Sequence, residues 1–144
     1  MRIALRCALC LLVLSLAPSP AIAEPKYVDD PDKYAAEVMQ LLVKGDMATL
    51  AKTVTDSIGK PESADTLKNA LGMLNGKTID YNGKVIDNTF GKSLRQIVYY
   101  SFVDSVGFIY YRFNFKMSSK GWILANFNFK TETNELFPKD FVDR

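Results

Sequence analysis

VGFIYYRFNFKM, residues 106–117, alternates between two kinds of side chain at every step. In an extended strand successive side chains point to opposite faces, so this segment presents two different surfaces. One surface is apolar and aromatic: Ile109, Tyr111, Phe113 and Phe115. The other mixes aromatic and polar groups: Phe108, Tyr110, Arg112, Asn114 and Lys116. The alternation predicts a β-strand whose apolar surface packs against the rest of the protein.

The same alternation continues on both sides of this segment, in Ser93–Val103 and Trp122–Thr131. The connections, Asp104-Ser105 and residues 118–121, are short, which predicts antiparallel neighbours. In the last strand, alternation assigns one face to Ile123, Ala125, Phe127 and Phe129, and the other to Leu124, Asn126, Asn128 and Lys130. We expect a fourth strand within Thr78–Phe90, where Asn82-Gly83 is either a tight hairpin turn or a bulge in one long strand.

The first half of the chain has a helical pattern instead. Asp30-Pro31 is typical of a helix N-cap followed by proline, and Asp46 can cap a second helix that ends at Gly59. A third apolar stripe, Leu67, Leu71 and Leu74, stops at Gly76. The acidic residues at the first helix start, Asp29, Asp30 and Asp32, are explained by capping and the helix dipole rather than by calcium binding. The pattern predicts an α+β domain with N-terminal helices packed on a curved antiparallel sheet of about four strands.

Three short motifs lie at the joints of this arrangement: LLVKGD at residues 41–46, LNGK at 74–77 and GWIL at 121–124. With the element order, they give the chain a resemblance to the NTF2-like superfamily (cystatin-like α+β roll), in particular to short exported uncharacterised bacterial members. The resemblance covers residues 32–129 and departs from the family plan because no strand is found between the second and third helices. It implies one NTF2-like domain over residues 24–144, and it carries no catalytic residue over to this chain.

The N-terminus has the order of a secretory signal peptide. Arg2 and Arg6 form a short positive n-region, the run from Ile3 to Leu16 is otherwise apolar, and Ala21-Ile22-Ala23 supplies small residues for cleavage before Glu24. The run is too short to span a bilayer comfortably, so we expect residues 1–23 to be removed and no stable membrane insertion afterwards. The chain has no Asn-x-Ser/Thr acceptor, which favours a bacterial periplasmic or secreted location.

Several chemistries are excluded after Ala23. Cys7 and Cys10 lie in the predicted signal peptide and the chain has no histidine, so histidine triads, thiol nucleophiles and ordinary zinc sites are not expected. Basic and acidic residues balance at 16 each once Arg2 and Arg6 are removed, which argues against nucleic acid. No glycine-rich phosphate loop is present. We therefore predict no metal, no cofactor and no catalytic residue.

Acid–base chemistry, if any, would use a polar set on the sheet: Asp80, Tyr81, Arg95, Tyr99, Tyr110 and Arg112. Arg112 on an aromatic-lined surface can bind a carboxylate bidentately. Alternatively, Arg95 and Arg112 lie on the solvent face or pair with an acidic neighbour across strands.

Eleven of the 17 aromatic residues lie between Tyr99 and Phe129. These residues are core, a protein or homodimer interface, or the lining of a ligand pocket. The candidate binding residues are Tyr99, Phe108, Tyr110, Arg112, Asn114 and Trp122. Leu136-Phe137-Pro138 and Phe141-Val142 form a tail that either folds back onto the domain or is exposed for a partner.

Three functions follow from these patterns. The first is a non-enzymatic binding module that uses the aromatic sheet face for an unknown protein partner or for itself. The second is a carrier or sensor of a small apolar ligand between helices and sheet. The third is a small hydrolase or isomerase with a buried carboxylate.

Overall fold

The computed structural model describes residues 24–132 of the 144-residue chain. The predicted signal peptide and the apolar motifs of the tail lie outside the described residues. In chain order the elements are β1 (Tyr27–Val28), α1 (Pro31–Val43), α2 (Met47–Ile58), α3 (Ala64–Ala70), β2 (Ile79–Phe90), β3 (Leu94–Val103), β4 (Gly107–Ser118) and β5 (Gly121–Lys130). Two 3₁₀ turns, Pro61–Ser63 and Leu71–Leu74, flank α3.

The helix boundaries follow from the predicted caps. The Asp30 side chain accepts hydrogen bonds from the backbone N–H groups of Asp32 and Lys33, at 2.9 and 3.3 Å. Asp46 accepts one from the Thr49 N–H at 3.1 Å, and Gly59 ends α2 in the left-handed conformation with φ 81°. These predictions are confirmed, but the third helix is short, with 3₁₀ turns on both sides in place of further α-helical turns.

The sheet has five antiparallel strands in the order β1-β5-β4-β3-β2. The predicted number of about four was low, because Tyr27–Val28 pairs with Ile123 and Trp122 of β5. The three helices follow β1 in the chain and precede the four long strands. None of the described helices is long and apolar enough to cross a membrane.

The structure of β2 decides whether Asn82-Gly83 forms a hairpin turn or a bulge. It is one continuous strand of 12 residues, with register shifts between Ile79 and Tyr81 and between Lys84 and Ile86. Asn82 and Gly83 lie between these two irregularities and pair with Ser101 and Tyr100. The pair therefore forms neither a hairpin turn nor the bulge itself.

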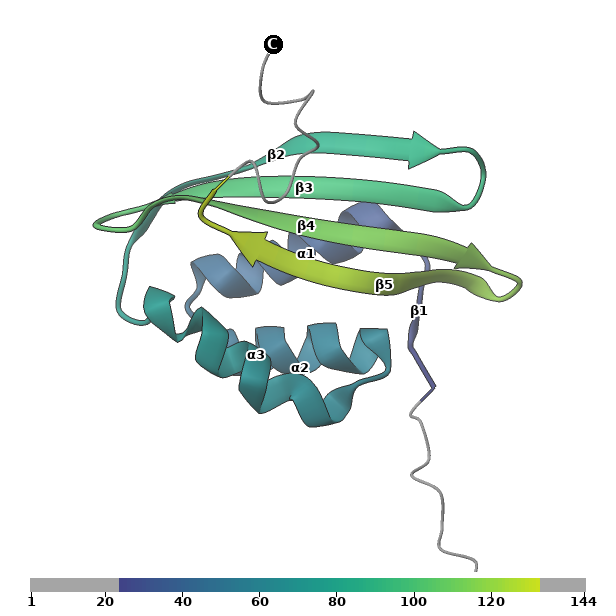
Figure 1. The fold of residues 1–144 in the computed structure, drawn as a ribbon, viewed down its shortest axis with the longest axis horizontal. Helices are drawn as coiled ribbons and strands as arrows, with labels where there is room; N and C mark the ends of the chain where they lie inside the picture. The colour runs from purple at the N-terminus through teal and green to yellow at the C-terminus, as the bar shows by residue number, and fades with distance from the viewer. Residues whose placement is uncertain (1–23, 133–144) are drawn as a thin grey trace, which may run out of the picture.

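All three helices lie on one face of the curled sheet, as Figure 1 shows. This inner face forms the core with the predicted apolar surface of β4, where Ile109, Tyr111, Phe113 and Phe115 are at most 1% exposed. Tyr34 of α1 meets Phe115 edge-to-face with ring centroids 6.0 Å apart. Ser101, buried beside them, shares a hydrogen bond of 3.0 Å with the Tyr111 hydroxyl, which satisfies both groups.

The predicted faces of β5 were wrong in one half of the strand. Asn114 pairs with Asn126 whereas Phe115 pairs with Leu124, so Ala125 is an extra residue at a bulge. One extra residue reverses the parity of the side chains before it. Leu124 is therefore fully buried in the core together with the partly buried Phe127, while Ala125 is exposed.

Candidate functional site

The face of the sheet turned away from the helices, here called the outer face, carries a continuous group of five aromatic side chains. We call Tyr81, Tyr100, Phe102, Phe108 and Tyr110 the outer aromatic patch. The register places them together, because Tyr81 pairs with Phe102, Tyr100 with Tyr110 and Phe102 with Phe108. Directly paired residues point to the same side of an antiparallel sheet.

The rings of the outer aromatic patch contact one another across three strands. Ring centroids lie 5.1 Å apart for Tyr81 and Tyr100 and 5.2 Å apart for Phe102 and Phe108. Tyr100 also lies 6.1 Å from Phe108, which links the two pairs. These distances are those of favourable aromatic pairs. Tyr81 and Phe108 nevertheless remain 54% and 50% exposed, so the patch has large apolar area available for contact.

Gly83 makes room for this arrangement. A Cβ at position 83 would lie 2.9 Å from the Tyr81 ring, closer than real carbon atoms approach. The ring of Tyr81 therefore lies over the backbone of its own strand and stacks on Tyr100, the ladder partner of Gly83. An aromatic ring that covers a strand glycine is a recurrent device in sheets.

Polar and basic side chains occupy several of the remaining outer-face positions on β3, β4 and β5. Gln96 donates a hydrogen bond from Nε2 to Asn114 Oδ1 at 3.1 Å, and Asn128 donates from Nδ2 to Asn126 Oδ1 at 2.6 Å. The charged side chains at the paired outer-face positions of β2–β5 are Arg112, Lys116 and Lys130, and all three are basic. The face therefore combines aromatic area with positive charge.

Two aliphatic residues at the centre of the outer face are buried. Val98 and Ile86 are ladder partners on β3 and β2, and they are 0% and 8% exposed. Neither belongs to the core cluster formed with the helices. Figure 1 shows α1–α3 on the opposite side, so none of these helices covers the pair. Two aliphatic side chains are thus buried on a face that the helices do not cover.

The six predicted binding residues divide between the two faces. Phe108, Tyr110, Arg112 and Asn114 lie together on the outer face of β4. Tyr99 lies on the inner face, 8% exposed, with its ring 6.3 Å from that of Phe113, and burial raises its pKa. Trp122 packs against the inner core and pairs with Val28 of β1. Tyr99 and Trp122 therefore lie on the opposite face of the sheet from the other four candidate residues.

Tyr99 lies on the inner face because of the length of the loop between β3 and β4. A two-residue connection would pair Val103 with Val106 and would place Tyr99 opposite Tyr110. Instead, Val103 pairs with Gly107 across a three-residue connection, which brings Tyr100 opposite Tyr110. The positive φ of 62° at Ser105, the middle residue, fits a three-residue turn. For this reason, and because the pairing of the strand expected within Thr78–Phe90 was not predicted, sequence reasoning did not group Tyr81, Tyr100 and Phe102 with Phe108 and Tyr110.

A charged cluster on the inner side holds the edge of the sheet to α1. Arg95 donates hydrogen bonds from Nε and from one terminal nitrogen to the two carboxylate oxygens of Asp87, at 2.9 and 2.8 Å. Lys84 Nζ lies 2.8 Å from Asp32 and 3.2 Å from Asp87. The Arg95 fork lowers the pKa of Asp87. The expectation of a cross-strand ion pair is thus confirmed for Arg95.

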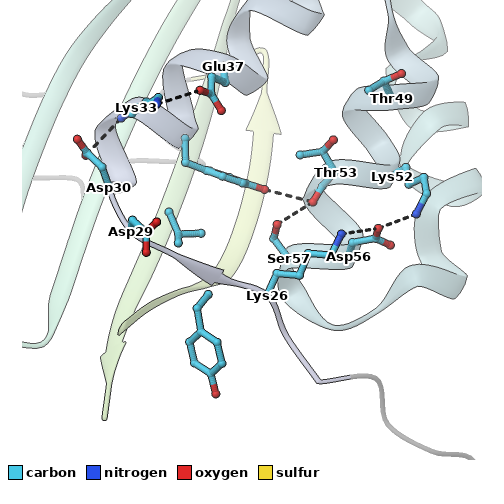
Figure 2. A pocket seen from close by; sticks show the side chains of 13 residues that line it. Lys26, Asp29, Asp30, Lys33, Glu37, Thr49, Lys52, Thr53, Asp56 and Ser57 are labelled. Atoms are coloured by element: carbon cyan, nitrogen blue, oxygen red, sulfur yellow. Dashed lines mark hydrogen bonds and ion pairs between the residues drawn. The ribbon is translucent and has the colours of Figure 1, made fainter. Parts of the chain in front are cut away.

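A polar cleft of about 530 Å³ opens between the segment around β1, α1 and α2. Figure 2 shows the Asp56 carboxylate at its wall, between the ammonium groups of Lys52 and Lys26 at 2.6 and 3.2 Å. The hydrogen bond from Lys52 lowers the pKa of Asp56. Across the cleft, the Tyr34 hydroxyl donates to the Thr53 carbonyl at 3.3 Å, and burial raises the Tyr34 pKa to about 12.

Asp56 and Tyr34 of the cleft do not match the needs of acid–base chemistry near neutral pH. A general acid or base works best when its pKa lies close to the operating pH. Asp56 stays ionised between two ammonium groups and Tyr34 stays protonated. Within residues 24–132 no group of three or more acidic side chains is placed to hold a metal ion. The ion pairs of Asp56 are better suited to holding the N-terminal segment against α2.

Much of the space between the helices and the inner face is filled, and its largest fully buried side chains include Tyr111, Phe113, Phe115, Met39, Leu42 and Leu50. A cleft of about 320 Å³ remains between α2, α3 and β5, lined by apolar side chains that include Ile58, Leu67 and Phe127. Among the described residues, large exposed apolar side chains gather on the outer face, where Tyr81, Phe102 and Phe108 are 54%, 39% and 50% exposed. No protein-family model and no curated protein sequence matches this chain.

Proposed function

We propose that this protein is an exported, non-enzymatic binding module that recognises an apolar peptide segment of a protein partner through its outer aromatic patch. The single observation that carries the proposal is the outer aromatic patch itself. Five rings in mutual contact lie on a face that none of the three helices covers. Exposed apolar groups of this extent on a small domain are typical of interaction sites.

The chemistry of the patch favours binding of polypeptide. Tyrosine and phenylalanine give large contact area at small entropic cost, since each has only two side-chain torsions. Aromatic residues are also enriched among the residues that dominate binding energy at interfaces. The basic groups on the same face, Arg112, Lys116 and Lys130, favour a segment that also carries acidic residues.

Export and family membership are part of the same proposal. The signal-like order of residues 1–23 supports export to a bacterial periplasm or exterior. Three helices packed on a curled antiparallel sheet support the NTF2-like resemblance. The aromatic rings in contact on the outer face favour an interaction surface, whereas a carrier of small apolar ligands would use the cleft between α2, α3 and β5.

The test is peptide binding by fluorescence anisotropy. Two labelled 12-residue peptides share the same Phe, Leu and Val residues, and one adds Asp and Glu whereas the other adds Lys. We expect the acidic peptide to bind more tightly and Phe108→Ser to weaken its binding by about tenfold, the effect of losing one aromatic anchor.

Met73→Ser is the matched control, because Met73 is 44% exposed on the helix side of the molecule, in the 3₁₀ turn after α3. This variant should bind as the wild type does. Equal affinity of the wild type, Phe108→Ser and a Tyr100→Ala variant would contradict the proposal. A homodimer that dissociates in Phe108→Ser would instead assign the patch to a second copy of the chain.

A further inference from the structure

We infer that residues 133–144 of the same chain, TNELFPKDFVDR, dock on the outer face and compete there with the partner segment. The competition rests on the proposed function, whereas the docking itself does not. Sequence, burial, chain path and charge each support the inference.

The first observation is the buried pair at the centre of the outer face. Val98 and Ile86 are 0% and 8% exposed, yet they do not belong to the helix-side core. Their neighbours on this face are Gln96 and Tyr100 on β3 and Arg112 on β4, whose Nε is itself buried. Burial of two aliphatic side chains and of part of an arginine on a face that no helix covers favours an apolar cover from another segment.

The second observation is where the described chain leaves the sheet. β5 ends at Lys130, whose ladder partner is Tyr110 of the outer aromatic patch. The chain therefore departs beside the patch. Leu136 follows Lys130 by six residue steps, enough to reach roughly 20 Å in an extended conformation. Neighbouring strands lie about 4.8 Å apart, so this length can cross β4 and β3 to Val98 and Ile86.

The third observation is complementarity of composition and charge. The segment supplies apolar groups in two clusters, Leu136-Phe137-Pro138 and Phe141-Val142. It also carries three acidic residues, Glu135, Asp140 and Asp143, against the basic pair Lys139 and Arg144. The charged groups at the paired outer-face positions are basic throughout. The outer face thus offers aromatic area next to basic groups, and residues 133–144 offer apolar side chains next to acidic groups, so the two are complementary.

A docked segment of the same chain has a consequence for the partner. Tethering gives it an effective concentration on the order of millimolar, so even weak docking keeps the face occupied. A partner that binds only the open face then binds more weakly, in proportion to the fraction of open molecules. The segment therefore competes with partners for the outer face, and only partners that bind the open face tightly enough displace it.

The experiment compares the wild-type chain with a Phe137→Asp/Phe141→Asp variant by methyl NMR. We expect the Val98 and Ile86 methyl resonances to shift by more than their linewidths, because the aromatic rings leave. The Val54 methyls in the helix-side core should stay in place, which shows that the fold is kept. A Thr133→Asp/Asn134→Asp variant adds the same charge without removing apolar groups and should resemble the wild type.

The variant also gives a binding readout. The acidic probe peptide should bind Phe137→Asp/Phe141→Asp about tenfold more tightly than the wild type, since the competitor is removed. Adding a free peptide of residues 133–144 should return the Val98 and Ile86 resonances toward their wild-type positions. Unchanged Val98 and Ile86 resonances in the variant would overturn the inference.

The two proposals fail in different ways. If the methyl resonances shift but no probe peptide binds either chain, docking stands and the proposed function is wrong. If the probe binds both chains equally and Phe108→Ser abolishes that binding, the proposed function stands and the competition is wrong.

Discussion

Asp87 and Arg95 form the ion pair whose contribution to stability is easiest to test. Arg95 and Asp87 are 22% and 27% exposed, so their bidentate pair is partly shielded from water. The pKa of Asp87 is lowered in the folded protein relative to about 3.9 in an unfolded chain. A lowered folded pKa contributes stability that is present above the unfolded pKa and is lost as pH falls through the folded value.

We predict that the free energy of unfolding, measured in urea, falls as pH drops below about 4. Arg95→Met should lower it by about 1 kcal/mol at pH 7 and should reduce its dependence on pH between pH 4 and pH 2. The dependence should not vanish, because Asp56 is shifted in the same direction. Lys92→Met, in the turn between β2 and β3, is the control. An identical pH profile for Arg95→Met and wild type would show that the pair does not act in this way.

Gly83 makes a second residue-scale prediction possible. Gly83→Ala places a Cβ where the Tyr81 ring lies and should move that ring off Tyr100. The near-ultraviolet circular dichroism of the tyrosines should decrease, with a stability change of about 1 kcal/mol or less. Tyr81→Ala should give the same loss, and the double variant should add nothing further. Additive effects of the two substitutions would show that Gly83 and Tyr81 are not coupled.

At the scale of elements, local signals predicted the helices and strands well. Asp30, Asp46 and Gly59 carry the chemistry of helix ends in their own side chains or backbone. The alternation of β4 is regular along its whole length, so its two faces were predicted residue by residue. β1 was not predicted, because two residues that pair with a strand almost a hundred positions away leave no periodic pattern.

The register of the strands was harder to predict than their presence, because one extra residue in a loop or strand moves the neighbouring side chains to the opposite face of the sheet. The loop between β3 and β4 has three residues rather than the expected two, so Tyr99 lies on the inner face and Tyr100 on the outer face. The extra Ala125 in β5 moved Leu124 into the core. Neither the length of this loop nor the extra residue of β5 can be read from local composition, because both depend on how the strands pair in the folded sheet.

The bulge leads to an element-scale prediction. Deleting Ala125 should leave Leu124 opposite Phe115 and Asn126 opposite Asn114 in a regular ladder, with both faces kept. We expect a loss of about 1 kcal/mol or less in unfolding free energy, measured by urea denaturation. Deleting Arg112 from β4 should instead unfold the domain, because it turns buried aromatic side chains such as Phe113 or Tyr111 to the outer face. Equal tolerance of the two deletions would contradict the register described above.

At the scale of the whole molecule, the sheet separates two tasks. Its inner face packs against the three helices (Figure 1) and forms the core. Its outer face carries the outer aromatic patch. The sequence indicated a surplus of aromatic residues and placed Phe108, Tyr110, Arg112 and Asn114 correctly on one surface. It did not separate Tyr99 and Trp122 from them, since that separation depends on long-range pairing.

The central claim is that the outer aromatic patch is the binding surface. The measurement that tests it most directly is mapping of the acidic probe peptide on the isotope-labelled protein by NMR. The claim predicts that shifts concentrate on Tyr100, Phe108 and the methyls of Val98. Shifts confined to the cleft around Asp56 and Tyr34, or no shifts at all, would contradict it.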